Sequence, residues 1–281
     1  MSEAITPFHL CVEQAALDDL QRRLSQIRWP ERETVEDWRQ GVPLDQMQRL
    51  CEHWRSRHDW RRCEAMLNGF GQFRTRIDGL DLHFLHIRSP EANVLPVIMT
   101  HGWPGSVIEC HKVIGPLTDP AAYGGDRADA FDLVIPSLPG YGFSDRPDRP
   151  GWTIERIAQA WAVLMRRLGY DRFCAQGGDW GASVTTEMAV QQAPGLAGIH
   201  LNLILAPPPT AEELSADPQS EQRAQLDRAR YHPTAAAMRR SSAPGPRRSA
   251  TGCRIHRSGR QRGSTRNSSN GPTVGAIPAP C

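Results

Sequence analysis

An aspartate between glycines is the first residue whose surroundings suggest chemistry. The segment GGDWG at residues 177–181 has the pattern small-x-nucleophile-x-small, in which a sharp turn between a strand and a helix exposes a reactive side chain. Small residues are needed because the turn is tight, and the N-terminus of the following helix stabilises a carboxylate. Asp179 is therefore a candidate nucleophile. The alternative is an aspartate that caps a helix within a glycine loop.

A second glycine-rich loop, HGWPGS at residues 101–106, follows an apolar run. A loop in this position supplies backbone N–H groups that stabilise an oxyanion. Trp103 and Trp180 are the candidate donors, because each stands directly after a tight glycine or after the nucleophile. An ordinary turn at the end of a strand is the alternative. A cis peptide bond before Pro104 would help to aim the loop.

Two amphipathic helices are expected to precede the sheet. Apolar residues recur at three- to four-residue spacing over residues 10–28 and again over residues 44–67, which predicts a helix in each range. From residue 74 the pattern changes to alternation. The run TRIDGLDLHFLHI predicts a β-hairpin that turns at Asp78 and Gly79.

Short apolar runs then alternate with helical spacing. The runs VLPVIMT, FDLVIPS, DRFCAQG and GIHLNLILA predict strands, and residues 153–168 and 182–192 predict helices. Strands that alternate with helices indicate an α/β fold with a doubly wound, mostly parallel sheet. Because the glycine-rich loops follow strands, the candidate residues are expected at one edge of this sheet. A third such loop, PSLPGYGFSD at residues 136–145, is expected to shape the pocket.

Composition narrows the choice of partners and of compartment. The net charge is +2, from 33 basic and 31 acidic residues, which gives no reason to expect a nucleic acid or membrane partner. The seven cysteines are odd in number and have no C-x-x-C spacing, which argues against a disulfide framework or a zinc site. No metal ion and no cofactor are expected. No apolar run has the length of a signal peptide or a membrane span. A soluble, cytoplasmic protein is expected.

Taken together, the motifs resemble the epoxide hydrolases of the microsomal type, including their N-terminal domain. The resemblance covers residues 1 to about 231. The segments that carry it, in that family's order, are RWP, DWR, LN, IDGLDLHFLHIRS, HGWPGS, PSLPGYGFSD, LGYDRFCAQGGDWGA and GIHLN. No membrane anchor precedes them, so the chain is most similar to the soluble bacterial members.

The resemblance implies an α/β-hydrolase that acts on a small apolar epoxide and water without a cofactor. A carboxylate is a weak nucleophile, but an epoxide is a strained electrophile. Asp179 would open the ring to form an ester, which water would hydrolyse to a vicinal diol. The backbone N–H groups of Trp103 and Trp180 would hold the oxyanion of this second step.

The resemblance also implies a histidine base, an acid that orients it, and lid tyrosines, all after the nucleophile in the chain. Only His200, His232 and His256 follow Asp179. His200 is expected to be a packed or pocket-wall residue, and the other two fall at or beyond the point where the resemblance ends. The general base and the acid are therefore expected to be absent. We expect negligible turnover and a truncated sheet with an exposed edge prone to aggregation.

The last fifty residues suggest a cause for this loss. They are rich in Arg, Ser, Pro and Gly, and contain no Leu and no aromatic residue after Tyr231, so they are expected to be disordered. Shifted reading of the codons for residues 244–281 permits segments similar to the family's later part. We therefore hypothesise a frame change between about Tyr231 and Ala243. Such a shift also explains the tail's arginines better than nucleic acid binding does.

The expected organisation has four parts. Residues 1–95 form an epoxide hydrolase N-terminal domain, 96–206 the first half of the hydrolase core, 207–232 the start of a lid, and 233–281 an off-frame tail. Two alternatives remain. Trp180 also permits a haloalkane dehalogenase, in which an indole N–H holds the halide, although the N-terminal helices argue against it. The other alternative is a non-catalytic remnant that uses the surviving pocket for binding.

Overall fold

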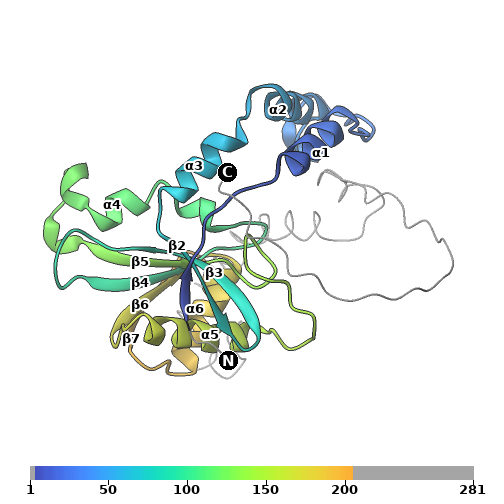
Figure 1. Cartoon of the computed structure of the whole chain (residues 1–281). Coiled ribbons are helices and arrows are strands. Elements are labelled where there is room, and N and C mark those ends of the chain that lie inside the picture. Colours follow the sequence, from blue (N-terminus) through green and yellow to red (C-terminus); the bar gives the residue numbers. More distant parts are fainter. Residues whose placement is uncertain (1–3, 205–281) are drawn as a thin grey trace, which may run out of the picture. The chain divides into compact units, whose positions relative to one another are not determined.

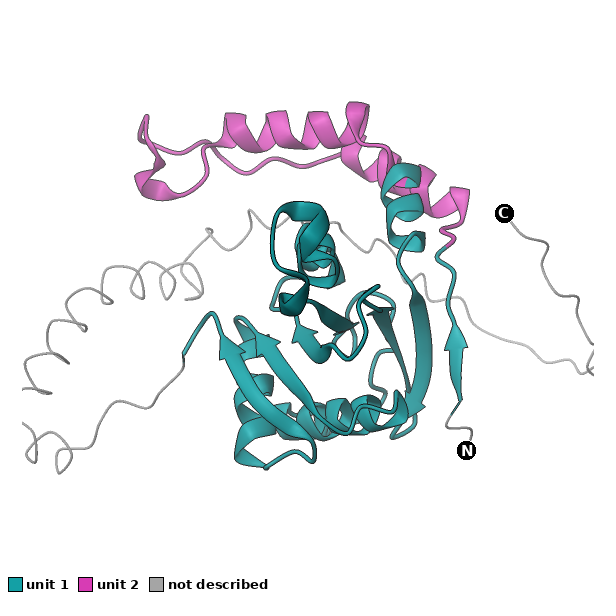
Figure 2. Cartoon of the chain, turned by 90° about the vertical axis from the view of Figure 1, so that its left-hand side faces the viewer, with its two compact units in different colours: residues 1–10, 61–207 teal, residues 11–60, 208–281 magenta. Residues whose placement is uncertain are grey.

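The computed structural model describes residues 4–204 of the chain. The described residues divide into two compact units (Figure 2). The larger comprises residues up to Leu10 and from Arg61 onward, and the smaller comprises residues 11–60. The expected lid segment at 207–232 and off-frame tail at 233–281, with His232, His256 and the hypothesised frame change, lie outside the described residues.

The smaller unit contains two helices, α1 (Gln14–Ser25) and α2 (Leu44–Arg57), which contact one another. The first lies within the helix predicted for residues 10–28, as expected from its apolar spacing. The start of α2 is fixed by Glu33, whose carboxylate accepts a hydrogen bond from the backbone N–H of Leu44 at 2.9 Å. This bond is the main cause of the lowered pKa of Glu33.

The single helix predicted over residues 44–67 is wrong. Helix α2 ends at Arg57, and a separate helix, α3 (Trp60–Asn68), follows. Between them His58 is extended, with ψ of 122°, and Asp59 is of the residue type that favours the position before a helix. The apolar spacing continues through this break, so periodicity alone could not reveal it.

The larger unit is built on a seven-stranded sheet of order β1-β2-β3-β5-β4-β6-β7 (Figure 1). Strands β5, β4, β6 and β7 run parallel, while β1, β2 and β3 add an antiparallel extension. The strands are β1 (Ile5–Pro7), β2 (Gln72–Ile77), β3 (Leu80–Ile87), β4 (Leu95–Thr100), β5 (Phe131–Pro136), β6 (Phe173–Gly177) and β7 (Leu196–Leu201). The expectation of a mostly parallel α/β sheet is confirmed.

The hairpin and the last described strand show how local sequence sets the sheet. The hairpin of β2 and β3 turns at Asp78 and Gly79, whose φ angles are 50° and 85°, as a two-residue turn between twisted strands requires. This hairpin, placed by sequence in the N-terminal domain, shares one sheet with the core strands. Strand β7 lies at Leu196–Leu201, earlier than the run GIHLNLILA predicted, because its pairing with β6 begins at Leu196.

Helices cover both faces of the sheet. Helix α4 (Ile114–Thr118) packs on β5, while α5 (Ile154–Arg167) and α6 (Trp180–Val190) lie together on the opposite face (Figure 1). The core beneath α5 and α6 includes the fully buried side chains of Trp161, Leu164, Phe173 and Met188. This packing holds the carboxyl ends of β4 and β6 in fixed positions.

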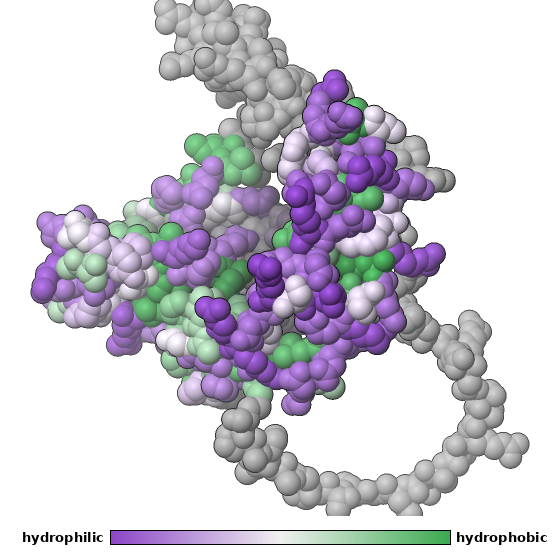
Figure 3. Space-filling model, turned by 90° about the horizontal axis from the view of Figure 1, so that it is seen from above, coloured by the Kyte–Doolittle hydropathy of each residue, from purple (hydrophilic) through white to green (hydrophobic). Residues whose placement is uncertain are grey.

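The outer surface of the described residues is mixed. Hydrophilic side chains predominate on the face shown in Figure 3, with hydrophobic groups scattered between them, which is usual for a protein in water. None of the helices within residues 4–204 combines the length and apolar character that crossing a bilayer requires.

A buried polar network lies between the hairpin and the loop that follows β5. The ring of His83 bonds to Ser137 Oγ at 2.9 Å and to Gln72 Oε1 at 3.0 Å. Gln72 donates in turn to Asn68 Oδ1 at 2.8 Å, and Asn68 bonds both backbone groups of Leu10. Because amide oxygens only accept, the His83 nitrogen facing Gln72 carries the proton. The Ser137 hydroxyl can donate to the other ring nitrogen, so the network accommodates a neutral imidazole.

This network predicts a loss of stability in acid. Burial, and more weakly the charge of Arg74, lowers the pKa of His83 from 6.5 to about 3. Below pH 6.5 the unfolded chain therefore binds a proton that the folded chain excludes. Stability is complete above this pH and falls towards pH 3, by about 1.4 kcal/mol per pH unit from this residue.

Urea unfolding at a series of pH values measures the effect. His86 and His101, whose pKa values burial also lowers, add to it in the same direction. We expect His83→Asn to make the pH dependence less steep. An unchanged slope in that variant would show that His83 does not control the acid response.

Candidate active site

The turn that carries Asp179 has the geometry expected of an exposed nucleophile. Asp179 lies between the end of β6 and the start of α6, and its φ is 52°, a left-handed value that is uncommon outside glycine. A Cβ on Gly177 would lie 2.0 Å from the Gly181 carbonyl oxygen, and a Cβ on Gly181 would lie 2.0 Å from the Thr100 carbonyl oxygen. The flanking glycines are thus required by backbone contacts.

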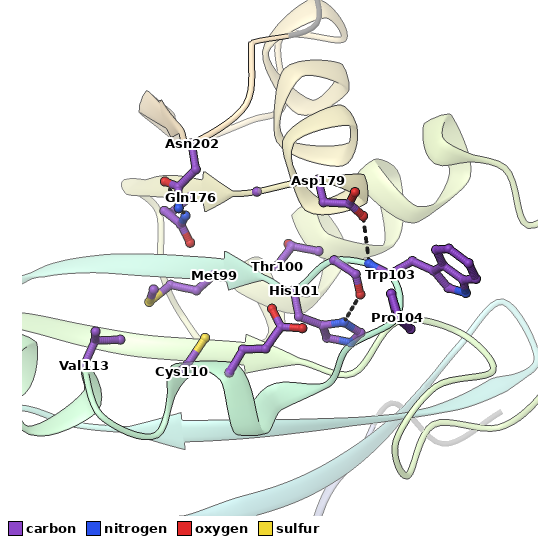
Figure 4. A pocket seen from close by; sticks show the side chains of 13 residues that line it. Met99, Thr100, His101, Trp103, Pro104, Cys110, Val113, Gln176, Asp179 and Asn202 are labelled. Atoms are coloured by element: carbon purple, nitrogen blue, oxygen red, sulfur yellow. Dashed lines mark hydrogen bonds between the residues drawn. The ribbon is translucent and has the colours of Figure 1, made fainter. Parts of the chain in front are cut away.

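The carboxylate of Asp179 does not cap the helix behind it. Asp179 occupies the position before α6, but its side chain makes no capping hydrogen bond. Instead Oδ1 accepts a hydrogen bond from the backbone N–H of Trp103 at 2.7 Å (Figure 4). The alternative of a capping aspartate is therefore wrong. The carboxylate faces the loop after β4, where the sequence predicted oxyanion donors.

That loop approaches Asp179 closely because residue 102 is glycine. A Cβ on Gly102 would lie 2.7 Å from the Asp179 Cβ and 2.9 Å from Oδ1, closer than carbon atoms can pack. The peptide bond between Trp103 and Pro104 is cis, the conformation that would help to aim the loop. Trp180 begins α6 directly after Asp179, so its N–H belongs to the first helical turn, where amides lack an acceptor within the helix.

His101 is buried and holds the loop from beneath. Its Nε2 accepts a hydrogen bond from the backbone N–H of Leu138 at 3.1 Å, which leaves the proton on Nδ1, and Nδ1 donates to the Gly102 carbonyl at 2.9 Å. Burial lowers the pKa of His101, against smaller opposing effects of the Gly102 bond and of the charge of Glu109. Both ring nitrogens are occupied, so this residue positions the loop.

A cavity of about 450 Å³ opens beside the carboxylate. Figure 4 shows Asp179 and Trp103 at one end and the amides of Gln176 and Asn202 at the other. The two amides are 3.3 Å apart. The lining residues are Met99, Thr100, His101, Gly102, Trp103, Pro104, Glu109, Cys110, Val113, Gln176, Gly178, Asp179 and Asn202.

Two other side chains of the cavity are described by their hydrogen bonding and by their protonation. The buried hydroxyl of Thr100 has no hydrogen-bond partner within the described part of the chain. Burial, with the nearby charge of Glu109, raises the pKa of the Cys110 thiol to about 11, so this cysteine stays protonated and is a poor nucleophile. Within residues 4–204, no cluster of three or more His, Cys, Asp or Glu residues could hold a metal ion.

Sequence reasoning missed part of the cavity and misplaced one residue. Gln176 and Asn202 stand beside recognised motifs, one in the strand before the GGDWG turn and one at the end of GIHLN, so position relative to the turn could have found them. No sequence motif marks Glu109, because its position at the cavity depends on how the loop after residue 106 folds. His200, expected to be packed or on the pocket wall, is exposed on β7 and does not line the cavity.

Comparison with known families matches two regions of the chain. Residues 5–110 match the model described as "Epoxide hydrolase N terminus", and residues 96–275 match the model described as "alpha/beta hydrolase fold". The two matches overlap across the loop that carries Trp103. The second also includes β4 to β7 and Asp179.

Individual relatives agree with these matches. A Stigmatella aurantiaca protein, provisionally named as an epoxide hydrolase, is 60% identical over 78% of this chain and 50% of its own length. "Epoxide hydrolase 1" of Oryctolagus cuniculus is 36% identical over 72% of this chain and 46% of its own. The solved structure of the Aspergillus niger epoxide hydrolase, 32% identical, aligns with a TM-score of 0.67 over 86% of this chain and 64% of that one. The chain spans about half the length of these curated relatives.

Proposed function

The chain belongs to the epoxide hydrolase family of the α/β-hydrolase fold, and from this premise we propose that Asp179 opens an epoxide ring to form a covalent ester. The observation that carries the proposal is the carboxylate itself. It is presented on a left-handed turn at the rim of the cavity, and one of its oxygens is held by the Trp103 N–H. The substrates are a small apolar epoxide and water.

The hydrogen bond to Trp103 supports separate roles for the two carboxylate oxygens in this proposal. Oδ1 is held at 2.7 Å by the Trp103 N–H, which leaves Oδ2 to attack a ring carbon of the epoxide. The carbon–oxygen bond of the ring breaks as the new ester bond forms, and the ring oxygen leaves with the electron pair and takes up a proton from solvent water. Oδ1 then becomes the carbonyl oxygen of the ester.

The same geometry serves the second step. Water adds to Cγ of the ester, and negative charge develops on Oδ1, which already accepts the Trp103 hydrogen bond. We propose the Trp180 N–H, in the first turn of α6, as the second donor. Collapse of this intermediate releases the diol and restores the carboxylate. Donors that are in place before charge develops are the main source of such stabilisation.

Water needs a general base, and within residues 4–204 no histidine that lines the cavity has a free ring nitrogen. His101 is the one histidine among the residues that line the cavity, and both of its ring nitrogens are engaged with the backbone. From the sequence, we expect no general base in the rest of the chain either. We therefore infer that this chain forms the ester faster than it releases the diol.

Incubation of the full chain with styrene oxide tests both steps. We expect intact-mass spectrometry to show a species heavier by one substrate, which accumulates while diol forms much more slowly. A folded chain that never gains this mass would contradict the first step. Diol production over many turnovers per chain would contradict the inferred slow release.

A parallel assay of halide release separates the epoxide from the haloalkane alternative. The match of residues 5–110 to the epoxide hydrolase N terminus favours the epoxide. We expect no halide release from a chlorinated or brominated alkane of similar size. Halide release that exceeds epoxide capture would favour the dehalogenase.

A further inference from the structure

A continuous series of hydrogen bonds ends at the Asp179 carboxylate. It begins where the backbone N–H of His83 donates to Ser144 Oγ at 3.0 Å, and the Ser144 hydroxyl donates to the Ser137 carbonyl at 2.7 Å. Both serines lie in the loop after β5. Ser137, Ser144 and His83 are all buried, so water does not compete for these bonds.

Two peptide groups carry the series onward. The Ser137 carbonyl belongs to the same peptide group as the Leu138 N–H, which donates to His101 Nε2 at 3.1 Å. Nδ1 of His101 then donates to the Gly102 carbonyl at 2.9 Å. That carbonyl belongs to the same peptide group as the Trp103 N–H, which donates to Asp179 Oδ1 at 2.7 Å.

Every bond in this series points the same way. Each peptide group accepts at its carbonyl and donates at its N–H, and the imidazole accepts at one nitrogen and donates at the other. Aligned hydrogen bonds polarise one another, and each is strengthened by roughly 10–30%. The direction is fixed because a backbone N–H can only donate, so Leu138 determines which nitrogen of His101 carries the proton.

The geometry points to Ser144 as a positioning residue that strengthens the oxyanion donor of Trp103 through His101. Ser144 does not line the cavity, so it acts only through this series. Its contribution to catalysis rests on the proposed function, because the Trp103 N–H matters chemically only if charge develops on Oδ1. The polarisation itself is a property of the resting protein.

Nuclear magnetic resonance of the isotope-labelled full chain tests the inference without a substrate. A weaker hydrogen bond moves an amide proton upfield. We expect Ser144→Ala to move the Trp103 amide proton upfield, because the Ser137 carbonyl loses its donor. Ser137→Ala is the matched control: it also removes a buried hydroxyl from the same loop, but that hydroxyl bonds to the His83 ring and not to the series.

An upfield shift in Ser144→Ala that Ser137→Ala does not share supports the inference. Equal shifts in both variants, or no shift in either, would overturn it. If Ser144→Ala does not fold, Ser144→Cys replaces it, because cysteine retains a weaker donor. We expect a smaller upfield shift of the Trp103 amide proton in this variant. No shift in Ser144→Cys would overturn the inference equally. A shift without any epoxide adduct would leave the polarisation in place and refute the proposed function alone.

Discussion

We expect Asp179→Asn to abolish covalent capture of an epoxide, with a rate reduced on the order of 10⁴-fold or more. The amide has nearly the shape of the carboxylate, and its oxygen can still accept the Trp103 hydrogen bond. Asparagine, like aspartate, is among the residue types that adopt a positive φ, which is 52° here. The variant therefore removes the nucleophile and little else. Intact-mass spectrometry after incubation with styrene oxide provides the measurement.

Asp78→Asn is the matched control for this substitution. Asp78 is also an aspartate in a left-handed turn, with φ of 50°, but it lies in the hairpin and pairs with Arg156. We expect this variant to capture the epoxide at the rate of the unaltered chain. Equal losses in both variants would mean that the effect comes from the turn and not from the carboxylate at Asp179.

Gly181→Ala is expected to disrupt the turn itself. The added Cβ would lie 2.0 Å from the Thr100 carbonyl oxygen and 3.0 Å from that of His101. Because both neighbours are backbone atoms, α6 must move away from β4 or the turn must open. We expect a loss of at least about 3 kcal/mol in the free energy of unfolding, together with loss of epoxide capture. Urea unfolding and intact mass measure the two effects.

Gly178→Ala tests whether this loss is specific. Gly178 lies in the same turn, but its φ is not positive, and an added Cβ would meet only the Asn202 side chain at 3.5 Å or more, an ordinary contact. We expect the stability of this variant to stay within about 0.5 kcal/mol of the unaltered chain. If Gly178→Ala and Gly181→Ala are equally destabilised, the close approach of α6 to β4 is not the cause.

The turn and the loop after β4 could be predicted from sequence because local backbone geometry limits which residues fit. Gly102, Gly177 and Gly181 are each required by a contact within a few residues of the nucleophile or of the strand beside it. The hairpin at Asp78 and Gly79 followed from the same kind of constraint. Glycine at such positions leaves a readable signal because a larger residue cannot take its place.

Contacts between distant segments left no comparable signal. The series from Ser144 to Asp179 joins three loops through backbone groups, which every sequence possesses. The hydrogen bond of the Asp179 carboxylate likewise depends on the loop that carries Trp103, more than seventy residues earlier in the chain. Such features follow from the fold as a whole.

Peptide mapping of the adduct tests the central claim most directly. The full chain is incubated with styrene oxide, digested, and sequenced by tandem mass spectrometry. We predict that the added mass lies on Asp179, in the peptide that contains GGDWG. An adduct found instead on Glu109, the other carboxylate of the cavity, or on a residue outside the cavity, would contradict the assignment of Asp179 as the nucleophile.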